Sequence, residues 1–86
     1  MIVTLGKEGL NKSWQEPFPL TTQCCRCKGE SRIAFVAHEG IDQNEENYVC
    51  RLHENNENGD WLHDCCTVAV YFCKKCLEPT ALSNQA

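Results

Sequence analysis

Two pairs of cysteines with Cys-x-x-Cys spacing constrain this chain more than any other feature. The first pair is Cys24 and Cys27, in QCCRCKG, and the second is Cys73 and Cys76, in TVAVYFCKKC. Each pair suits a tight turn that directs two sulfur atoms at one point, and four thiolates in a tetrahedron are a preferred ligand set of structural Zn²⁺. Cys25 lies inside the first turn, and its spacing to Cys27 is poorer. The sequence therefore predicts one zinc site built from Cys24, Cys27, Cys73 and Cys76.

The short length of the chain favours a metal site that stabilises the fold. Its 86 residues make one small domain, a size at which a hydrophobic core alone gives marginal stability. The chain begins MIVTLGKEGLNKSW, in which Lys7 and Glu8 follow only a few apolar residues. This start is therefore not typical of a secretory signal. The apolar run 68–73 is too short to span a bilayer. We therefore expect a cytoplasmic protein, in which closely spaced cysteines bind metal more often than they form disulfides.

Residues 31–38 and 67–72 are predicted to be the two main strands. SRIAFVAH alternates in its apolar positions, and TVAVYF is apolar on both faces, which is typical of a well-buried strand. Strand 31–38 leaves the first turn and strand 67–72 arrives at the second, so the turns meet only if these strands are antiparallel. A shorter strand over 48–53 is predicted to form a hairpin with 31–38, and residues 54–66 would cross over to 67–72.

With these features the chain resembles the zinc ribbon family, over Gln23 to Glu78. The resemblance implies a three-stranded antiparallel sheet with two cysteine-bearing knuckles around one zinc ion. Many ribbon knuckles have glycine directly after the second cysteine, whereas Lys28 and Leu77 occupy these positions here. The long separation of the two pairs also implies an insertion. The expected fold is a small β-rich, metal-stabilised, zinc-ribbon-like domain.

Three segments follow from this interpretation. Residues 1–22 would form an N-terminal strand and an irregular arm, residues 23–78 the ribbon domain, and residues 79–86 a C-terminal tail with a terminal turn near Pro79. The arm has no sustained hydrophobic period. Its apolar side chains are expected to pack across the core, and the alternative is an exposed patch for a partner; they are Trp14, Phe18 and Leu20.

A second group of potential ligands lies between the two pairs. Cys50 with His53, and His63 with Cys66, have Cys-x-x-His and His-x-x-Cys spacing that suits a second zinc. The order of the pairs weakly resembles cross-brace modules such as RING domains, but the separation of His53 from His63 is longer. Cys50 and His53 would also face opposite sides of a regular strand. The alternative is that Cys50, Cys65 and Cys66 are small buried residues.

The charge distribution narrows the classes of partner. The net charge of −4 argues against general affinity for nucleic acid or an anionic membrane. Between Glu39 and Asp64 there are eight acidic side chains and one basic one, Arg51. The cysteine pairs have basic neighbours instead, which either offset the charge of about −2 on four zinc-bound thiolates or form a phosphate-binding surface. These neighbours are Arg26, Lys28, Arg32, Lys74 and Lys75.

We therefore expect a non-enzymatic interaction module that binds Zn²⁺ and recognises another protein, with no membrane contact. One alternative is a nucleic-acid-binding ribbon that uses the basic end. Another is electron transfer, since rubredoxin is similar in placing two Cys-x-x-Cys turns around iron. A thiol enzyme or metal carrier is a further alternative, because Cys25 is a surplus cysteine beside the basic residues Arg26 and Lys28, a setting that favours a reactive thiol. No general base can be assigned to Cys25, and no catalytic residue is expected.

Overall fold

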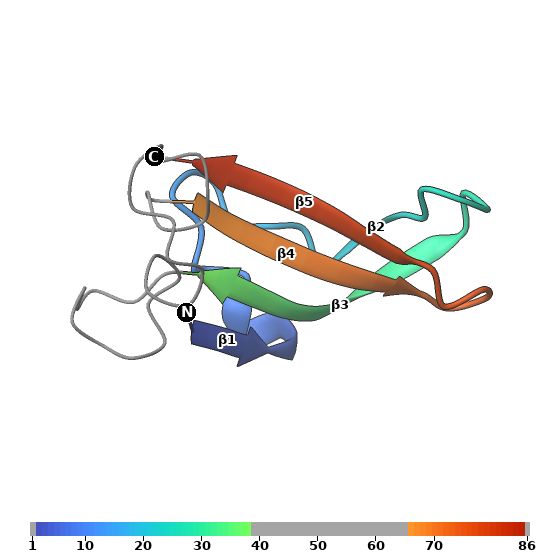
Figure 1. The fold of residues 1–86 in the computed structure, drawn as a ribbon, viewed down its shortest axis with the longest axis horizontal. Coiled ribbons are helices and arrows are strands. Elements are labelled where there is room, and N and C mark those ends of the chain that lie inside the picture. The colour runs from blue at the N-terminus through green and yellow to red at the C-terminus, as the bar shows by residue number, and fades with distance from the viewer. Residues whose placement is uncertain (1, 39–65, 86) are drawn as a thin grey trace, which may run out of the picture.

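Antiparallel strands build the computed structural model, which describes residues 2–38 and 66–85. One five-stranded sheet has the strand order β1-β3-β4-β5, with β2 also paired to β3 (Figure 1). A 3₁₀ helix, η1 (Gly6–Gly9), follows the first strand. Within the described ranges, no helix combines the length and apolar character needed to cross a bilayer. The strands are β1 (Ile2–Leu5), β2 (Thr21–Gln23), β3 (Glu30–His38), β4 (Cys66–Cys73) and β5 (Pro79–Gln85).

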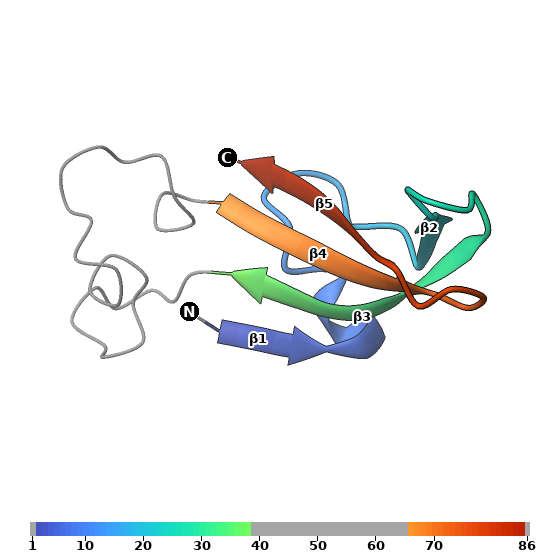
Figure 2. The same ribbon diagram turned by 45° about the vertical axis from the view of Figure 1, so that its right-hand side comes forward.

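The central pair of the sheet is β3 and β4, which run antiparallel. Their register places Ser31 opposite Cys73 at one end and His38 opposite Thr67 at the other, with a bulge after Ile33. The strands predicted over 31–38 and 67–72 are therefore confirmed, together with their antiparallel pairing. This pairing brings the turn before β3 and the turn after β4 to the same end of the sheet (Figure 2).

The N-terminal arm covers one face of the sheet. Phe18 from the arm packs with Val36, Ala69 and Tyr71, and all four are buried. The Tyr71 hydroxyl donates a hydrogen bond of 2.6 Å to the carbonyl oxygen of Pro19, which ties the arm to β4. Burial also raises the pKa of Tyr71. The core is therefore built from Val36 of β3, the alternate residues Ala69 and Tyr71 of β4, and Phe18 of the arm.

The packing predicted for the arm is right for Phe18 and wrong for Trp14 and Leu20. Trp14 is 54% exposed and Leu20 is 57% exposed. The backbone N–H of Trp14 donates to Oδ1 of Asn84 at 3.2 Å, so the arm is attached beside β5 while the indole ring remains in solvent. Of these three side chains, Phe18 alone packs into the core, where the partly buried Leu10 lies beside it.

The opposite face of the sheet, here called the outer face, has apolar side chains from four strands. Val3, Leu5 and Phe72 are 51%, 73% and 43% exposed, respectively. The register places these side chains on one face because paired residues project to the same side of a sheet. Arg32 and Ser83 are polar residues at the same face, opposite Phe72 and Val68. Its apolar residues are Val3, Leu5, Phe35, Ala37, Val68, Val70, Phe72, Pro79 and Ala81.

The number of strands differs from the expected three. The C-terminal segment was predicted to form a turn near Pro79, but it is the strand β5, which pairs with β4 from Phe72↔Pro79 to Cys66↔Gln85. The free edge of β4 accounts for this, because pairing satisfies its backbone hydrogen-bonding groups. β1 confirms the short N-terminal strand and also joins the sheet. The predicted strand over 48–53 lies outside the described residues.

Candidate metal centre

Two turns meet at one end of the sheet, where β2 leads into β3 and β4 leads into β5 (Figures 1 and 2). Cys24 directly follows β2, and Cys73 is the last residue of β4. β2 and β4 pair with opposite edges of β3, with Gln23 opposite Glu30 and Cys73 opposite Ser31, so both strands end at the same end of the sheet. The sheet therefore positions the first cysteine of each pair on a strand end, and the turn positions the second.

The first turn is closed by backbone hydrogen bonds. The N–H of Cys24 donates to the carbonyl oxygen of Gly29 at 2.8 Å, and the N–H of Lys28 donates to that of Cys24 at 3.2 Å. The N–H of Arg26 points at the Cys24 sulfur, 3.4 Å away. Lys28 has a φ of +62°, in the left-handed region. This turn directs its backbone donors at a sulfur atom, as a metal-binding knuckle requires.

The second turn repeats the first, residue for residue. The N–H of Cys73 donates to the carbonyl oxygen of Glu78 at 3.2 Å, and the N–H of Leu77 donates to that of Cys73 at 3.1 Å. The N–H of Lys75 lies 3.4 Å from the Cys73 sulfur, and Leu77 has a φ of +61°. The two cysteine pairs therefore have the same local structure despite different sequences at the turn positions.

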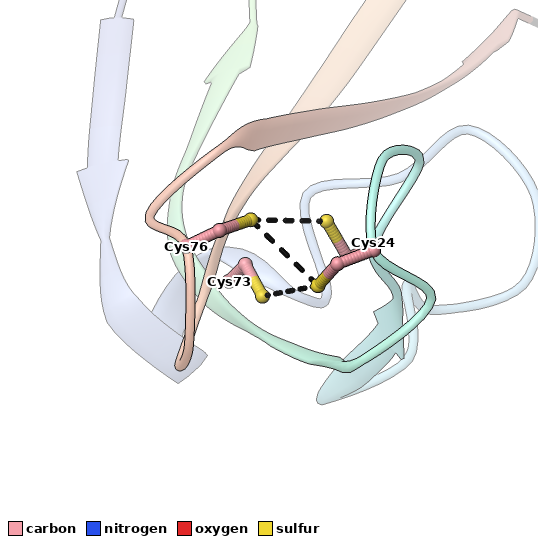
Figure 3. A group of neighbouring side chains, drawn as sticks. Cys24, Cys73 and Cys76 are labelled. Atoms are coloured by element: carbon pink, nitrogen blue, oxygen red, sulfur yellow. Dashed lines mark hydrogen bonds between the residues drawn. The ribbon is translucent and has the colours of Figure 1, made fainter.

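The four sulfur atoms predicted to lie together do so (Figure 3). The Sγ atoms of Cys27 and Cys73 are 3.5 Å apart, and that of Cys76 is 3.7 Å from those of both Cys24 and Cys27. All four lie within 4.8 Å of one another, and all four cysteines are free. A regular tetrahedron with metal–sulfur bonds of about 2.3 Å has sulfur atoms about 3.8 Å apart. The donor set therefore fits a metal ion.

Burial divides the four cysteines into an inner and an outer pair. Cys24 and Cys73 are each 1% exposed, whereas Cys27 and Cys76 are exposed. The inner pair belongs to the apolar interior of the sheet, and the outer pair faces solvent. A metal ion at this point would be reached from the end of the molecule, and its binding would hold the two turns together.

Backbone hydrogen bonds favour the thiolate form of the inner pair. In each turn, N–H groups three and two residues after the first cysteine lower the pKa of that cysteine. These groups belong to Cys27 and Arg26 in the case of Cys24, and to Cys76 and Lys75 in the case of Cys73, whose pKa is lowered to about 6. A thiolate, the form that binds metal, is thus already favoured on the buried side of the cluster.

The outer cysteine of the second pair behaves differently. The backbone N–H of Glu78 lowers the pKa of Cys76, but desolvation and the neighbouring sulfur atoms of Cys73, Cys24 and Cys27 outweigh it and raise this pKa to about 12. Each additional thiolate in so small a space meets negative charge that is already present. The cluster therefore requires a cation before all four thiols lose their protons.

Two ion pairs connect the segment around the first cysteine turn with the segment around the second. Nζ of Lys74 lies 2.9 Å from a carboxylate oxygen of Glu30, and a guanidinium nitrogen of Arg26 lies 3.6 Å from one of Glu78. The Lys74 N–H also donates to the carbonyl oxygen of Glu30 at 3.0 Å. These side chains are largely exposed, so each ion pair contributes at most about 1 kcal/mol. The basic end is thus partly neutralised by carboxylates.

Cys25 lies beside the cluster but does not belong to it. Its backbone N–H donates to Oγ1 of Thr80 at 3.0 Å, and its thiol lies 3.5 Å from the carbonyl oxygen of Pro79. The prediction that Cys24, rather than Cys25, lies with Cys27 in the cluster is therefore confirmed. The sequence offered no signal for the contact of Cys25 with Thr80, because the two residues are far apart along the chain. In the predicted second site, Cys50, His53 and His63 lie outside the described residues.

The four clustered cysteines and the two matching turns suggest a small metal-binding module. The arrangement is consistent with the knuckles expected from the zinc ribbon resemblance. Comparisons of the chain with protein-family models, with curated proteins and with solved structures find no match. The functional interpretation therefore rests on the geometry of Cys24, Cys27, Cys73 and Cys76.

Proposed function

We propose that this chain is a zinc-stabilised, non-enzymatic module that binds another protein through its outer face. Zinc is favoured as the metal because four thiolates in a closed tetrahedron are typical of its structural sites. Iron in a rubredoxin-like centre is the alternative, and the colour of the purified protein distinguishes the two metals. In the proposed role, the metal holds the sheet together and takes no part in a reaction.

The exposed apolar surface of the outer face is the observation that supports protein binding. Val3, Leu5 and Phe72 are all more than two-fifths exposed, and they share this face with half-buried Phe35, Val68 and Val70. A contiguous apolar surface of this kind is typical of sites that contact a partner. The proposal places the protein in the cytoplasm, where thiols stay reduced and available to a metal.

Nucleic-acid binding at the basic end is less well supported. Two of the basic side chains near the metal centre, Arg26 and Lys74, already pair with carboxylates. A nucleic-acid-binding surface needs several cations that remain available to phosphate groups. Membrane binding is not part of the proposal.

The first test is the metal content of the native protein, measured by native mass spectrometry with the free thiols counted on the same sample. One zinc per chain is expected, in a colourless protein. Iron would contradict the zinc assignment, and a metal-free protein without free thiols would contradict the site itself.

The second test concerns the outer face. Proteins retained from a cell extract by the wild-type chain would be identified, purified and titrated against the Leu5→Glu variant. We expect a direct complex that Leu5→Glu abolishes, because a charge in an apolar contact is not solvated. The control is Asn11→Glu, which adds the same charge to an exposed position of the arm. Equal binding by Leu5→Glu and Asn11→Glu would exclude the outer face, and retention of nucleic acid alone would favour the alternative.

A further inference from the structure

A groove of about 450 Å³ opens on the edge of β3, between the end of β1 and the start of β2. β1 pairs with residues 35–38 of β3 and β2 with residues 30–32, so the two strands leave a gap on the same edge. Gly6, at a φ of +62°, turns the chain away from this edge. The volume falls within the range of about 300–1,000 Å³ that is usual for small-molecule sites.

Two cationic side chains line this groove, Lys7 and Arg32. The ion pairs among residues 2–38 and 66–85 use neither of them. Glu30 also lines the groove, but its carboxylate is 2.9 Å from Nζ of Lys74, and this contact, more than Arg32, lowers the pKa of Glu30. Among the described lining residues, Glu30 is the only carboxylate, and it pairs with Lys74 outside the groove. The two positive charges of Lys7 and Arg32 therefore outnumber the one negative charge of the lining.

Two apolar residues also line the groove. Leu20, which the sequence predicted to be in the core, is 57% exposed and borders the groove together with Ile33. A guanidinium group presents parallel N–H donors that match a carboxylate or a phosphate. An apolar wall beside such a group selects a ligand that has both an oxyanion and an apolar body.

We propose that the groove binds a small organic anion. Its carboxylate or phosphate would contact Arg32 and Lys7, and its apolar body would lie against Leu20 and Ile33. This site is separate from the four cysteines. Arg32 lies opposite Phe72 in the register, so the groove borders the outer face, but its lining does not include Val3, Leu5 or Phe72. The variants Leu5→Glu and Arg32→Gln therefore test the protein-binding face and the groove separately.

The test is an NMR titration of the zinc-loaded full chain with phenylacetate and, separately, phenyl phosphate. We expect saturable shifts of the backbone amides of Gly6, Thr21 and Ile33 with at least one of them. The comparison of the two probes shows whether the groove prefers carboxylate or phosphate. Inorganic phosphate and 2-phenylethanol each lack one half of the proposed ligand, so both should bind more weakly. Equal binding of inorganic phosphate would contradict a role for the apolar wall.

A pair of variants tests whether the probe binds in the groove. Arg32→Gln should weaken the preferred probe about tenfold or more, because it removes a charge-assisted pair of hydrogen bonds. Lys12→Gln removes the same charge from an exposed position of the arm and should leave the affinity unchanged. Retained zinc and an unchanged thermal transition would show that Arg32→Gln still folds. The proposal is overturned if Arg32→Gln binds normally, if no probe saturates, or if the shifts centre on Lys28 and Lys75 beside the metal.

Discussion

Lys28 and Leu77 occupy equivalent positions, each directly after the second cysteine of its pair. Their φ angles of +62° and +61° lie in the left-handed region, where a side chain crowds the backbone and glycine is preferred. Leu77 is 73% exposed, so little packing compensates for this conformation. Both turns therefore adopt the left-handed conformation without the glycine that many ribbon knuckles have, which adds strain to each.

Glycine at either position should stabilise the metal-loaded protein. We expect Lys28→Gly and Leu77→Gly each to raise the free energy of unfolding by about 0.5–1 kcal/mol, since relief of the strain exceeds the added flexibility of the unfolded chain. Urea denaturation of the zinc-bound protein measures the change. Leu77→Ala is the control, because it shortens the side chain but keeps the strain, and it should not stabilise. A loss of stability in both glycine variants would show that these φ angles are not strained.

The affinity for metal should rise with pH. Cys73, with a pKa of about 6, is largely a thiolate at neutral pH, whereas Cys76, with a pKa of about 12, keeps its proton until the metal displaces it. Acidification therefore weakens binding, and it does so more steeply below about pH 6, where Cys73 is also protonated. Competition with a chromophoric chelator at successive pH values measures this dependence. Cys25→Ser should give the same curve, and an affinity independent of pH would exclude thiol ligands.

At the scale of single residues, the sequence predicted which cysteines cluster, but it did not predict which residues surround them. The Cys-x-x-Cys spacing identified the four clustered cysteines because a tight turn is a local structure. The contacts of Lys74 with Glu30 and of Cys25 with Thr80 join residues distant in the chain. Their positions depend on the register of the strands, which spacing alone does not determine.

The elements of the sheet differ in how clearly the sequence marks them. β3 and β4 have long apolar alternation and were predicted within two residues of their observed ends. β5 ends in SNQ, which resembles a polar tail, and it is a strand because β4 offers it a free edge. β2 has three residues, too few for a period to show. Strands that form through pairing rather than through their own burial therefore escaped the prediction.

The contact between η1 and β3 depends on the absence of one side chain. A Cβ atom at Gly9 would lie 2.8 Å from Cβ and Cγ2 of Val36, which is fully buried. We expect Gly9→Ala to lower the free energy of unfolding by about 1–3 kcal/mol, because the helix must move away from the core. Chemical denaturation with zinc bound measures the effect. Glu8→Ala, at an exposed position of η1, should change stability by less than about 0.5 kcal/mol. Equal stability of the two variants would contradict this packing.

The core and the metal centre are continuous in the molecule as a whole. The buried apolar residues of the described segments number seven, and two of them, Cys24 and Cys73, are themselves candidate ligands. The remainder is a small core, formed mainly by Phe18, Val36 and Tyr71. Domains of this size have little stability to spare, and structural zinc contributes about 10–16 kcal/mol of apparent binding energy to folding. We therefore expect a metal ion bound by the four cysteines to decide whether the sheet forms.

Removal of the metal should unfold the whole sheet rather than loosen one end. We expect a chelator to abolish the cooperative thermal transition, and Cys76→Ser to lack both zinc and that transition, because three thiols leave the site open and the two turns unjoined. Circular dichroism and metal analysis of the same samples measure both effects. Cys25→Ser should keep one zinc and a normal transition, since its thiol lies outside the cluster. If Cys76→Ser kept its zinc and its cooperative unfolding, the cluster would not be the element that holds β3 and β4 together.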